Sequence, residues 1–235
     1  LCQLIASNAD GNPFYVEEFI KMLIEEGCIV RGNERWFIKQ ERIQAIHVPA
    51  TLTELLQARL DSLPYEEKKI LQRAAIIGRL FWDSAVSALK TEGGAEANIP
   101  QVLRSLLQRE FIFHRDQSKF SGTEEYTFKH SILREVTYET VLLKMRRAYH
   151  RQAAQWFEIH SEQRVNEYAG VIAEHYERGG ENSRATEWLI RAGEAAGQAN
   201  AFREAIAFFE RAVKLVENPN SAQNANLLIR LGECY

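Results

Sequence analysis

The sequence predicts a mainly α-helical protein built from three units, at residues 1–63, 64–144 and 145–235. Apolar residues recur three and four positions apart through most of the chain, which is typical of amphipathic helices. Two short β signals occur late in the second unit, and they follow three helical segments. Near the C-terminal end, small and aromatic residues recur at the spacing of a helical repeat.

Composition limits the classes of protein that fit this chain. Of its 235 residues, 46% are hydrophobic, so a packed core is expected. The formal net charge of −3 argues against a generally basic nucleic-acid binder. No apolar run reaches the roughly 20 residues that cross a bilayer, and no signal peptide is seen. Cys2, Cys28 and Cys234 form no CxxC pair, which favours the reducing cytoplasm over a disulfide framework or a zinc site.

The first unit begins with a short helix and continues with an amphipathic one. Asn12 suits an N-cap, and Pro13 suits the first helical position, where no amide hydrogen is needed. Gly27 is a good stop for this second helix. Its apolar stripe consists of Val16, Phe19, Ile20, Leu23 and Ile24.

A hairpin and a further helix complete the first unit. Residues 28–30 and 36–38 are apolar and flank the polar segment 31–35, which predicts a small β-hairpin. Thr51 and Glu54 fit a capping box at the start of the next helix. The apolar residues of that helix are Leu52, Leu55, Leu56 and Leu60.

The second unit has the element order of a winged helix. Helices are predicted from Pro64 to near Gly78, over 82–89 and over 99–109, with a loop at 91–94. A strand at 111–114, a polar turn at 116–122 and a returning strand at 125–129 form the small hairpin of the wing. One last helix is predicted over residues 131–143.

The third unit is predicted to be an α-solenoid of tetratricopeptide-like helix pairs. Ala205, Phe209 and Ala212 have the spacing of the second helix of such a repeat, and Gly193 falls where the first helix needs a small residue. The pattern Leu228-x2-Leu231-Gly232-x2-Tyr235 matches the first helix of the next repeat. Residues 218–221 would then be an insertion that makes this repeat longer than usual. An earlier helix pair, over about residues 146–178, matches the repeat pattern less well. The chain lacks an initial Met and ends within this pattern, so we expect it to be a piece of a longer protein.

No complete catalytic constellation is visible, so this chain is not expected to be an enzyme. It contains no GxxxxGK[ST] loop, no HExxH and no GxSxG. His150 and His160 lie ten residues apart without neighbouring ligands, which is no metal spacing. The paired glutamates, such as Glu17-Glu18, point apart on a helix and therefore suit solvated faces.

A winged helix raises the question of DNA binding. The recognition helix would be residues 99–109, with Gln101, Arg104, Gln108 and Arg109 as its polar residues. Residues 64–144 hold 12 Lys and Arg against 11 Asp and Glu. Because phosphate neutralisation supplies most of the affinity for DNA, this balance favours a packing module over a DNA reader.

Four segments in this order together resemble one known family. They are Gly11-Asn12-Pro13-Phe14-Tyr15-Val16-Glu17-Glu18, Pro49 to Leu63, Ala74-Ala75-Ile76-Ile77-Gly78-Arg79 and Phe128-Lys129-His130. The layout resembles the STAND class of signal-transduction ATPases, especially the bacterial modules fused to nucleotide cyclases, kinases or large transcriptional regulators. The resemblance covers essentially the whole chain. It implies that residues 1–63 are the helical lid of a P-loop ATPase domain that is not in this chain.

The resemblance also implies two nucleotide contacts. The family's glycine-x-proline turn packs against the nucleotide and corresponds to Gly11-Asn12-Pro13. The family's winged-helix histidine contacts the ADP phosphate, locks the resting state and corresponds to His130. Lys129 and Ser131 replace the Met and Asp that flank this histidine in relatives from immune receptors. ADP or ATP with Mg is therefore expected for the full-length protein, and no cofactor for this chain alone.

Plainer interpretations stay open for both residues. Pro13 can belong to a simple helix cap, and His130 can be a junction residue that satisfies backbone groups. A phosphate contact is physically reasonable, because histidine switches its charge near neutral pH and helix N-termini favour anions.

The function expected from the resemblance is that of a regulatory module in an ADP/ATP-controlled switch. Its partners would be a protein or inducer bound by the repeats and the P-loop domain in cis, with no membrane partner. The alternatives are a tetratricopeptide interaction scaffold and, less favoured, a winged-helix DNA-binding regulator.

Overall fold

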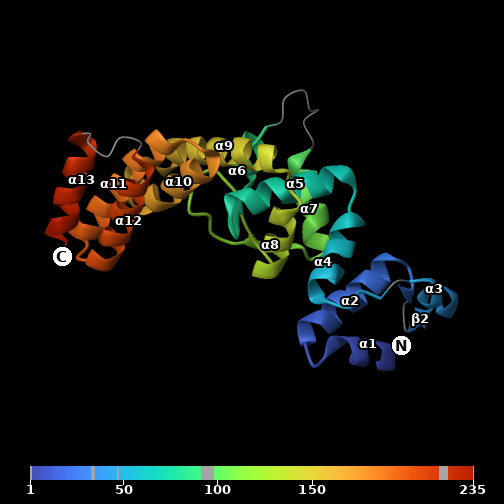
Figure 1. Ribbon diagram of the computed structural model, residues 1–235. Coiled ribbons are helices and arrows are strands. Elements are labelled where there is room, and N and C mark those ends of the chain that lie inside the picture. The colour runs from blue at the N-terminus through green and yellow to red at the C-terminus, as the bar shows by residue number, and fades with distance from the viewer. Residues whose placement is uncertain (1, 33–34, 47, 91–97, 217–221, 235) are drawn as a thin grey trace.

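The computed structural model describes residues 2–32, 35–46, 48–90, 98–216 and 222–234, and it is mainly helical as the sequence predicts. The elements form an extended row, with the N-terminal unit at one end and the last helices at the other (Figure 1). The loop at 91–94, the insertion at 218–221 and Tyr235 lie outside the described residues. None of the described helices combines the length and apolarity that a bilayer crossing demands.

The N-terminal unit consists of four helices and a two-stranded hairpin. Its helices are α1 (Cys2–Ala9), α2 (Pro13–Glu25), α3 (Gln40–Ala45) and α4 (Leu52–Asp61). Strands β1 (Ile29–Arg31) and β2 (Trp36–Ile38) pair antiparallel, as expected from the apolar runs. Helix α3 was not anticipated, because its six residues are too short to show a helical period.

The predicted helix ends are present. The Asn12 side chain accepts hydrogen bonds from the backbone amides of Phe14 (3.0 Å) and Tyr15 (3.4 Å), and Pro13 is the first helical residue. Gly27 adopts a positive φ of 65°, which suits a residue without Cβ after the end of α2. The Thr51 hydroxyl caps α4 through the amide of Glu54 at 3.2 Å.

The middle unit has a winged-helix topology. Its helices are α5 (Tyr65–Ile77), α6 (Asp83–Ala88), α7 (Ile99–Gln108) and α8 (Ser131–Glu139), and its strands are β3 (Leu80–Trp82), β4 (Ile112–Arg115) and β5 (Glu125–Phe128). The sheet order is β3-β5-β4, and all pairs are antiparallel. Strand β3 was not predicted from the sequence. Its three residues form a strand because they pair with β5, where Phe81 lies opposite Tyr126, and such a distant pairing leaves no local sequence pattern.

The helix predicted over residues 131–143 ends earlier than the sequence suggests. Helix α8 ends at Glu139, and α9 (Leu143–Ser161) starts after a short turn. Side chains satisfy the backbone carbonyls that this break exposes. Arg146 donates to the carbonyls of Glu139 and Val141, both at 2.7 Å, and Gln72 donates to Thr140. Long-range side-chain partners therefore end α8, and a local sequence pattern does not reveal them.

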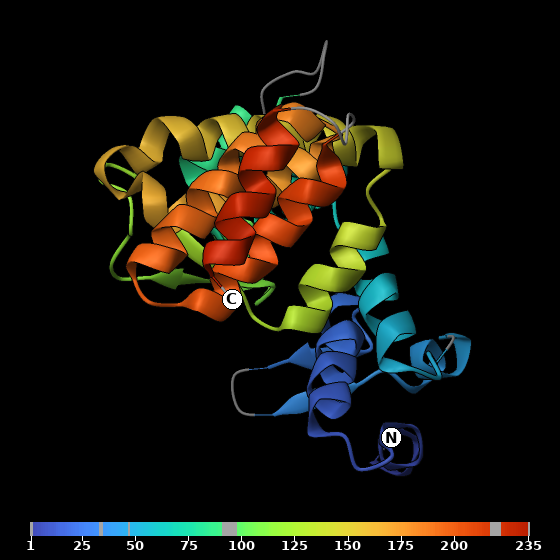
Figure 2. The same ribbon diagram turned by 60° about the vertical axis from the view of Figure 1, so that its left-hand side comes forward.

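The C-terminal part is a row of helices packed side by side (Figures 1 and 2). After α9 and a short 3₁₀ turn come α10 (Val165–Gly179), α11 (Asn182–Gln198), α12 (Phe202–Leu215) and α13 (Ala222–Glu233). A Cβ on Gly193 would come within 2.6 Å of the Phe209 ring, so α11 and α12 approach as closely as the spacing predicts. The helical-repeat architecture is thus confirmed, whereas the assignment to tetratricopeptide repeats stays a prediction.

One hydrophobic core continues from the winged helix into helices α9 and α10. Trp82 of β3 stacks on Trp156 of α9 with ring centroids 5.5 Å apart, and Phe120 packs edge-on against both rings. The buried cluster extends from Leu56 to Ala185. The winged helix and the first helix pair therefore share one packed core, to which these large aromatic rings contribute much of the buried apolar area.

A chain of buried polar side chains also crosses this junction. The Tyr138 hydroxyl is 3.0 Å from Nε2 of His150, whose Nδ1 is 2.8 Å from Nδ1 of His175. His175 also bonds to the backbone of Ile77 at the end of α5. Neutral imidazoles can satisfy every one of these contacts, since each ring has one donor and one acceptor. Burial, together with nearby positive groups such as Arg178 and Arg134, lowers the pKa of His150 to about 2 and that of His175 to about 3.

We predict that acid destabilises this junction. The unfolded histidines titrate near 6.5, so below that pH the unfolded state binds protons that the folded state does not, and stability falls as pH falls. Each histidine contributes at most about 1.4 kcal/mol of loss per pH unit. Urea unfolding followed by tryptophan fluorescence should show a weaker pH dependence in His175→Gln. Gln101→Ala, an exposed substitution that removes no titratable group, should leave that dependence unchanged, and an equal slope in all three proteins would contradict the assignment.

Candidate functional site

The two segments that the resemblance singled out lie against each other. Helix α2 begins at Pro13, and the ring of the next residue, Phe14, lies 3.8 Å from the ring of His130, measured between centroids. His130 occupies the junction between β5 and α8, as expected. A second link joins the same segments, because the Lys129 ammonium bonds to the Glu17 carboxylate across 112 residues of sequence. Pro13 itself is exposed at the start of α2.

His130 has an unused buried nitrogen. The residue is the N-cap of α8 with extended backbone (φ −136°), yet its side chain makes no capping hydrogen bond to that helix. Within the part of the chain that the structure describes, Nε2 is buried and has no hydrogen-bond partner. Burial lowers the pKa of the ring, and the neighbouring Lys129 lowers it further. The imidazole is therefore neutral near pH 7 and offers one nitrogen for an additional contact.

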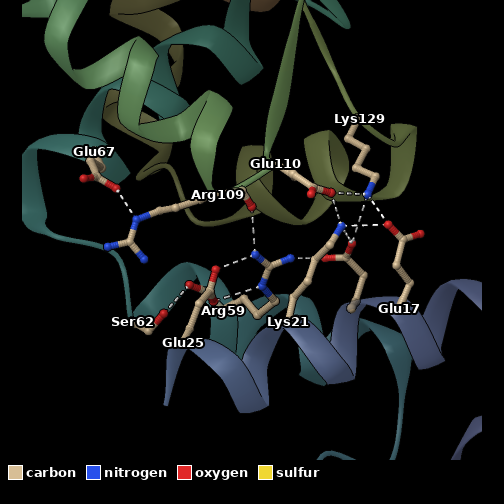
Figure 3. A network of polar contacts seen from close by, with 10 residues as sticks. Glu17, Lys21, Glu25, Arg59, Ser62, Glu67, Arg109, Glu110 and Lys129 are labelled. Carbon is tan, nitrogen blue, oxygen red and sulfur yellow. Dashed lines mark hydrogen bonds and ion pairs between the residues drawn. The ribbon is translucent and has the colours of Figure 1, made fainter. Parts of the chain in front are cut away.

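Two lysines and two glutamates join α2 to the winged helix. Lys21 on α2 contacts Glu17 at 2.7 Å and Glu110 at 2.6 Å, and Lys129 contacts the same two carboxylates. The hydrogen bonds from Lys129 and Lys21 lower the pKa of Glu17 to about 2. Figure 3 shows this four-residue set between α2 and the segment that carries Lys129. The set forms a network rather than an isolated pair, so its members hold one another in place.

Arg59 connects α4, α2 and the end of α7. The Arg59 side chain is only 1% exposed. Its guanidinium forms an ion pair with Glu18 and another with Glu25, the latter at 2.7 Å. It also donates a hydrogen bond to the backbone carbonyl of Arg109 at 3.1 Å, and Figure 3 shows Arg59 between Glu25 and Arg109. It also lies 4.6 Å from the centroid of the Phe111 ring. Burial disfavours the charged form, but the two carboxylates outweigh burial and raise the pKa of Arg59. The bidentate bond to Glu25 is the geometry that arginine makes best with a carboxylate.

Three groups at this site have the donor types of a metal site. Ligand atoms of Glu17, Glu18 and His130 lie within 4.8 Å of one another. The same carboxylates already bind Lys21, Lys129 and Arg59. A metal ion would have to displace those three positive groups from the carboxylates.

The sequence identified part of this site and missed the rest. It singled out Pro13 and His130, and the structure brings their segments together. It gave no role to Arg59, Lys21 or Glu110, which make most of the polar contacts. One signal was available: Arg59 follows Leu52, Leu55 and Leu56 at helical spacing and thus interrupts an apolar stripe.

Helix α7 is the element that would be the recognition helix of a DNA-binding winged helix. Its exposed residues include Gln101, Arg104 and Gln108, and the Arg104 side chain donates to the Pro100 carbonyl at 3.3 Å. Arg109, at its end, pairs with Glu67 at 3.2 Å. DNA binding through this helix stays untested.

We predict that Arg59 is essential for stability. Arg59→Met should lower the free energy of unfolding by about 3–5 kcal/mol, because the buried Glu18 loses its strongest partner. Lys68→Met is the matched control: its pair with Asp61 is exposed and should cost less than about 1 kcal/mol. Chemical denaturation of both variants measures the difference. Equal losses would refute a special role for the buried guanidinium.

A comparison with curated proteins finds a distant relative of this chain. No protein-family model matches the chain. An uncharacterized protein of Rhizobium meliloti (strain 1021) is 26% identical over 230 residues, which cover 93% of this chain and 20% of that protein. The chain therefore spans about a fifth of the length of this relative, whose description names no activity.

Proposed function

We propose that this chain is the regulatory part of an ADP/ATP-controlled signalling switch. In this proposal residues 1–63 are the lid of a P-loop ATPase domain elsewhere in the natural protein, and residues 64–144 are a winged helix that closes on the lid. The helices of 145–235 bind a protein or inducer and pass that event on. The chain itself does not hydrolyse ATP, and the natural protein acts in the cytoplasm.

The contact between the two motif segments carries the proposal. A winged helix that is controlled by nucleotide needs a histidine that faces the lid with an uncommitted nitrogen. His130 meets this requirement, since its Nε2 is buried without a partner and its ring lies against Phe14. Lys129 lies directly beside it, with its ammonium already paired with Glu17 and Glu110. The unpartnered imidazole nitrogen can donate a hydrogen bond to an anionic oxygen, which is the chemistry of a phosphate.

The chain's own residues set the resting state. Pro13 and His130 are the proposed ADP contacts, and bound ADP, with Mg²⁺ for ATP, supplies negative charge at the lid. The lysine–glutamate network of Glu17, Lys21, Glu110 and Lys129 holds the lid and winged helix together. Exchange of ADP for ATP opens the pair only to the extent that the two nucleotides differ in affinity for the two states.

A second candidate is an interaction scaffold built on the helical repeats. Helices α10, α11 and α12 form a groove, and such a surface can bind a partner without any nucleotide. If the chain is such a scaffold, its first two units only support the repeats. The sequence of the natural protein upstream of this chain separates the two proposals. A P-loop ATPase domain there favours the nucleotide-controlled switch, and its absence favours the interaction scaffold.

We predict that His130→Ala weakens ADP binding by the full-length protein by about 10-fold or more, which is the usual loss for one hydrogen bond to a charged group. Titration calorimetry measures the affinity. His114→Ala, on the exposed wing, is the control and should bind ADP like the unchanged protein. Unchanged affinity in His130→Ala would overturn the phosphate role.

A further inference from the structure

Strand β2 presents a row of exposed apolar side chains at the N-terminal end of the molecule (Figure 1). Trp36, Phe37 and Ile38 are 55%, 60% and 54% exposed. Val30 of β1, which lies opposite Phe37, is 38% exposed. By contrast, Ile29 of β1 is buried in the same cluster as residues of α2, so β1 anchors the hairpin and β2 lies outside. Adjoining exposed apolar side chains, unlike single ones, mark an interaction surface in many proteins.

The outer edge of β2 is open to a further strand. Within the part of the chain that the structure describes, this sheet consists of β1 and β2 alone. The Lys39 amide donates to the Cys28 carbonyl at 2.8 Å, which makes these two residues a hydrogen-bonded pair. Hydrogen-bonded and non-hydrogen-bonded pairs alternate along an antiparallel ladder, so Ile38 and Ile29 form a non-hydrogen-bonded pair. The backbone amide and carbonyl of Ile38 therefore point away from β1, where another strand can bind them.

Positive side chains flank the exposed apolar row. Arg35 precedes the row and Lys39 follows it, and both side chains are exposed. Among the described residues neither side chain forms an ion pair, and the exposed Glu41 of α3 pairs with neither of them. Since no ion pair within this chain neutralises the two charges, carboxylates of another molecule can pair with them directly.

The same two charges argue against pairing of two copies of this chain through β2. An antiparallel pairing centred on Phe37 would cover all three apolar residues, and it would place Arg35 of each copy opposite Lys39 of the other. Like charges directly opposite each other destabilise a pair of strands, and lysines at strand edges protect against self-association. The occupant that fits is a strand of different composition, with carboxylates where β2 is flanked by cations.

We propose that β2 binds an extended, acidic-ended segment of a partner protein, which adds to the hairpin as a third strand. The backbone of that segment would pair with Ile38, and its apolar side chains would lie beside those of Phe37 and Ile38. Acidic residues at its two ends would meet Arg35 and Lys39. Addition of a strand to a sheet edge is a recurring mode of peptide recognition. The inference goes beyond the proposed function: it needs no nucleotide, so its failure would leave the contact between lid and winged helix untouched.

Fluorescence anisotropy with synthetic peptides tests the proposal on the whole chain. The probe is a labelled peptide of about seven residues, with glutamate at both ends and alternating valine and threonine between them. One control peptide has lysine in place of glutamate. A second control has methyl groups on its central backbone nitrogens, which removes the donors that a third strand needs. We expect the probe to bind and both controls to bind at least about tenfold more weakly. No binding of the probe, or equal binding of all three peptides, would overturn the proposal.

Variants of this chain locate the binding site. Ile38→Pro removes the amide that faces the open edge and leaves the ladder with β1 intact, so it should weaken binding of the probe about tenfold. Arg35→Glu with Lys39→Glu should weaken binding to a similar extent. Lys144→Glu with Arg147→Glu, an equal charge change on exposed residues of α9, is the matched control and should have little effect. Circular dichroism confirms that each variant is folded, and equal weakening by the control pair would refute binding at β2.

The oligomeric state provides an independent check. Sedimentation equilibrium of the unchanged protein should give a monomer, since the flanking cations oppose self-pairing of β2. A dimer that Ile38→Pro dissociates would show that a second copy occupies the strand edge, and it would overturn the assignment to a different partner.

Discussion

The buried guanidinium of Arg59 is the interaction on which the arrangement of the first two units depends. It binds Glu18 and Glu25 of α2 and the backbone carbonyl of Arg109 at once, so a single side chain fixes α2 and α4 against the end of α7. A buried charge is costly unless its partners are complete, and here they are supplied by two separate elements. Moving α2 away from α4 would separate these charges from one another, so the pairing favours this arrangement of the two helices.

The candidate site is built on this joint. Glu18 faces Arg59 in the interior, and its neighbour Glu17 faces Lys129 at the surface, so one turn of α2 connects the buried pair with the outer network. The outer network includes exposed groups, since Glu17 and Glu110 are about half exposed. Exposed pairs exchange readily, whereas the inner pair does not. The outer contacts, beside His130, are therefore the ones that another group can replace more easily.

The sequence predicted features that depend on neighbouring residues better than features that depend on contacts between distant segments. Helix periodicity, the Asn12 cap, the Gly27 stop and the approach at Gly193 were all predictable, because each depends on a few neighbouring residues or on one fixed spacing. Strand β3, the break between α8 and α9, and the partners of Arg59 were not, because they depend on contacts between distant segments. Within the site, the histidine could be named from a motif, but its surroundings required the fold.

The distance between the lid and the winged helix tests the central claim most directly. Nitroxide labels at the exposed positions Gln40 and Gln101 report it by double electron–electron resonance, in the full-length protein with other accessible cysteines removed. The proposed switch gives one narrow distance distribution with ADP and a broader or longer one with ATP and Mg²⁺. The same distribution with both nucleotides would contradict it, and the helical groove would then become the main functional surface.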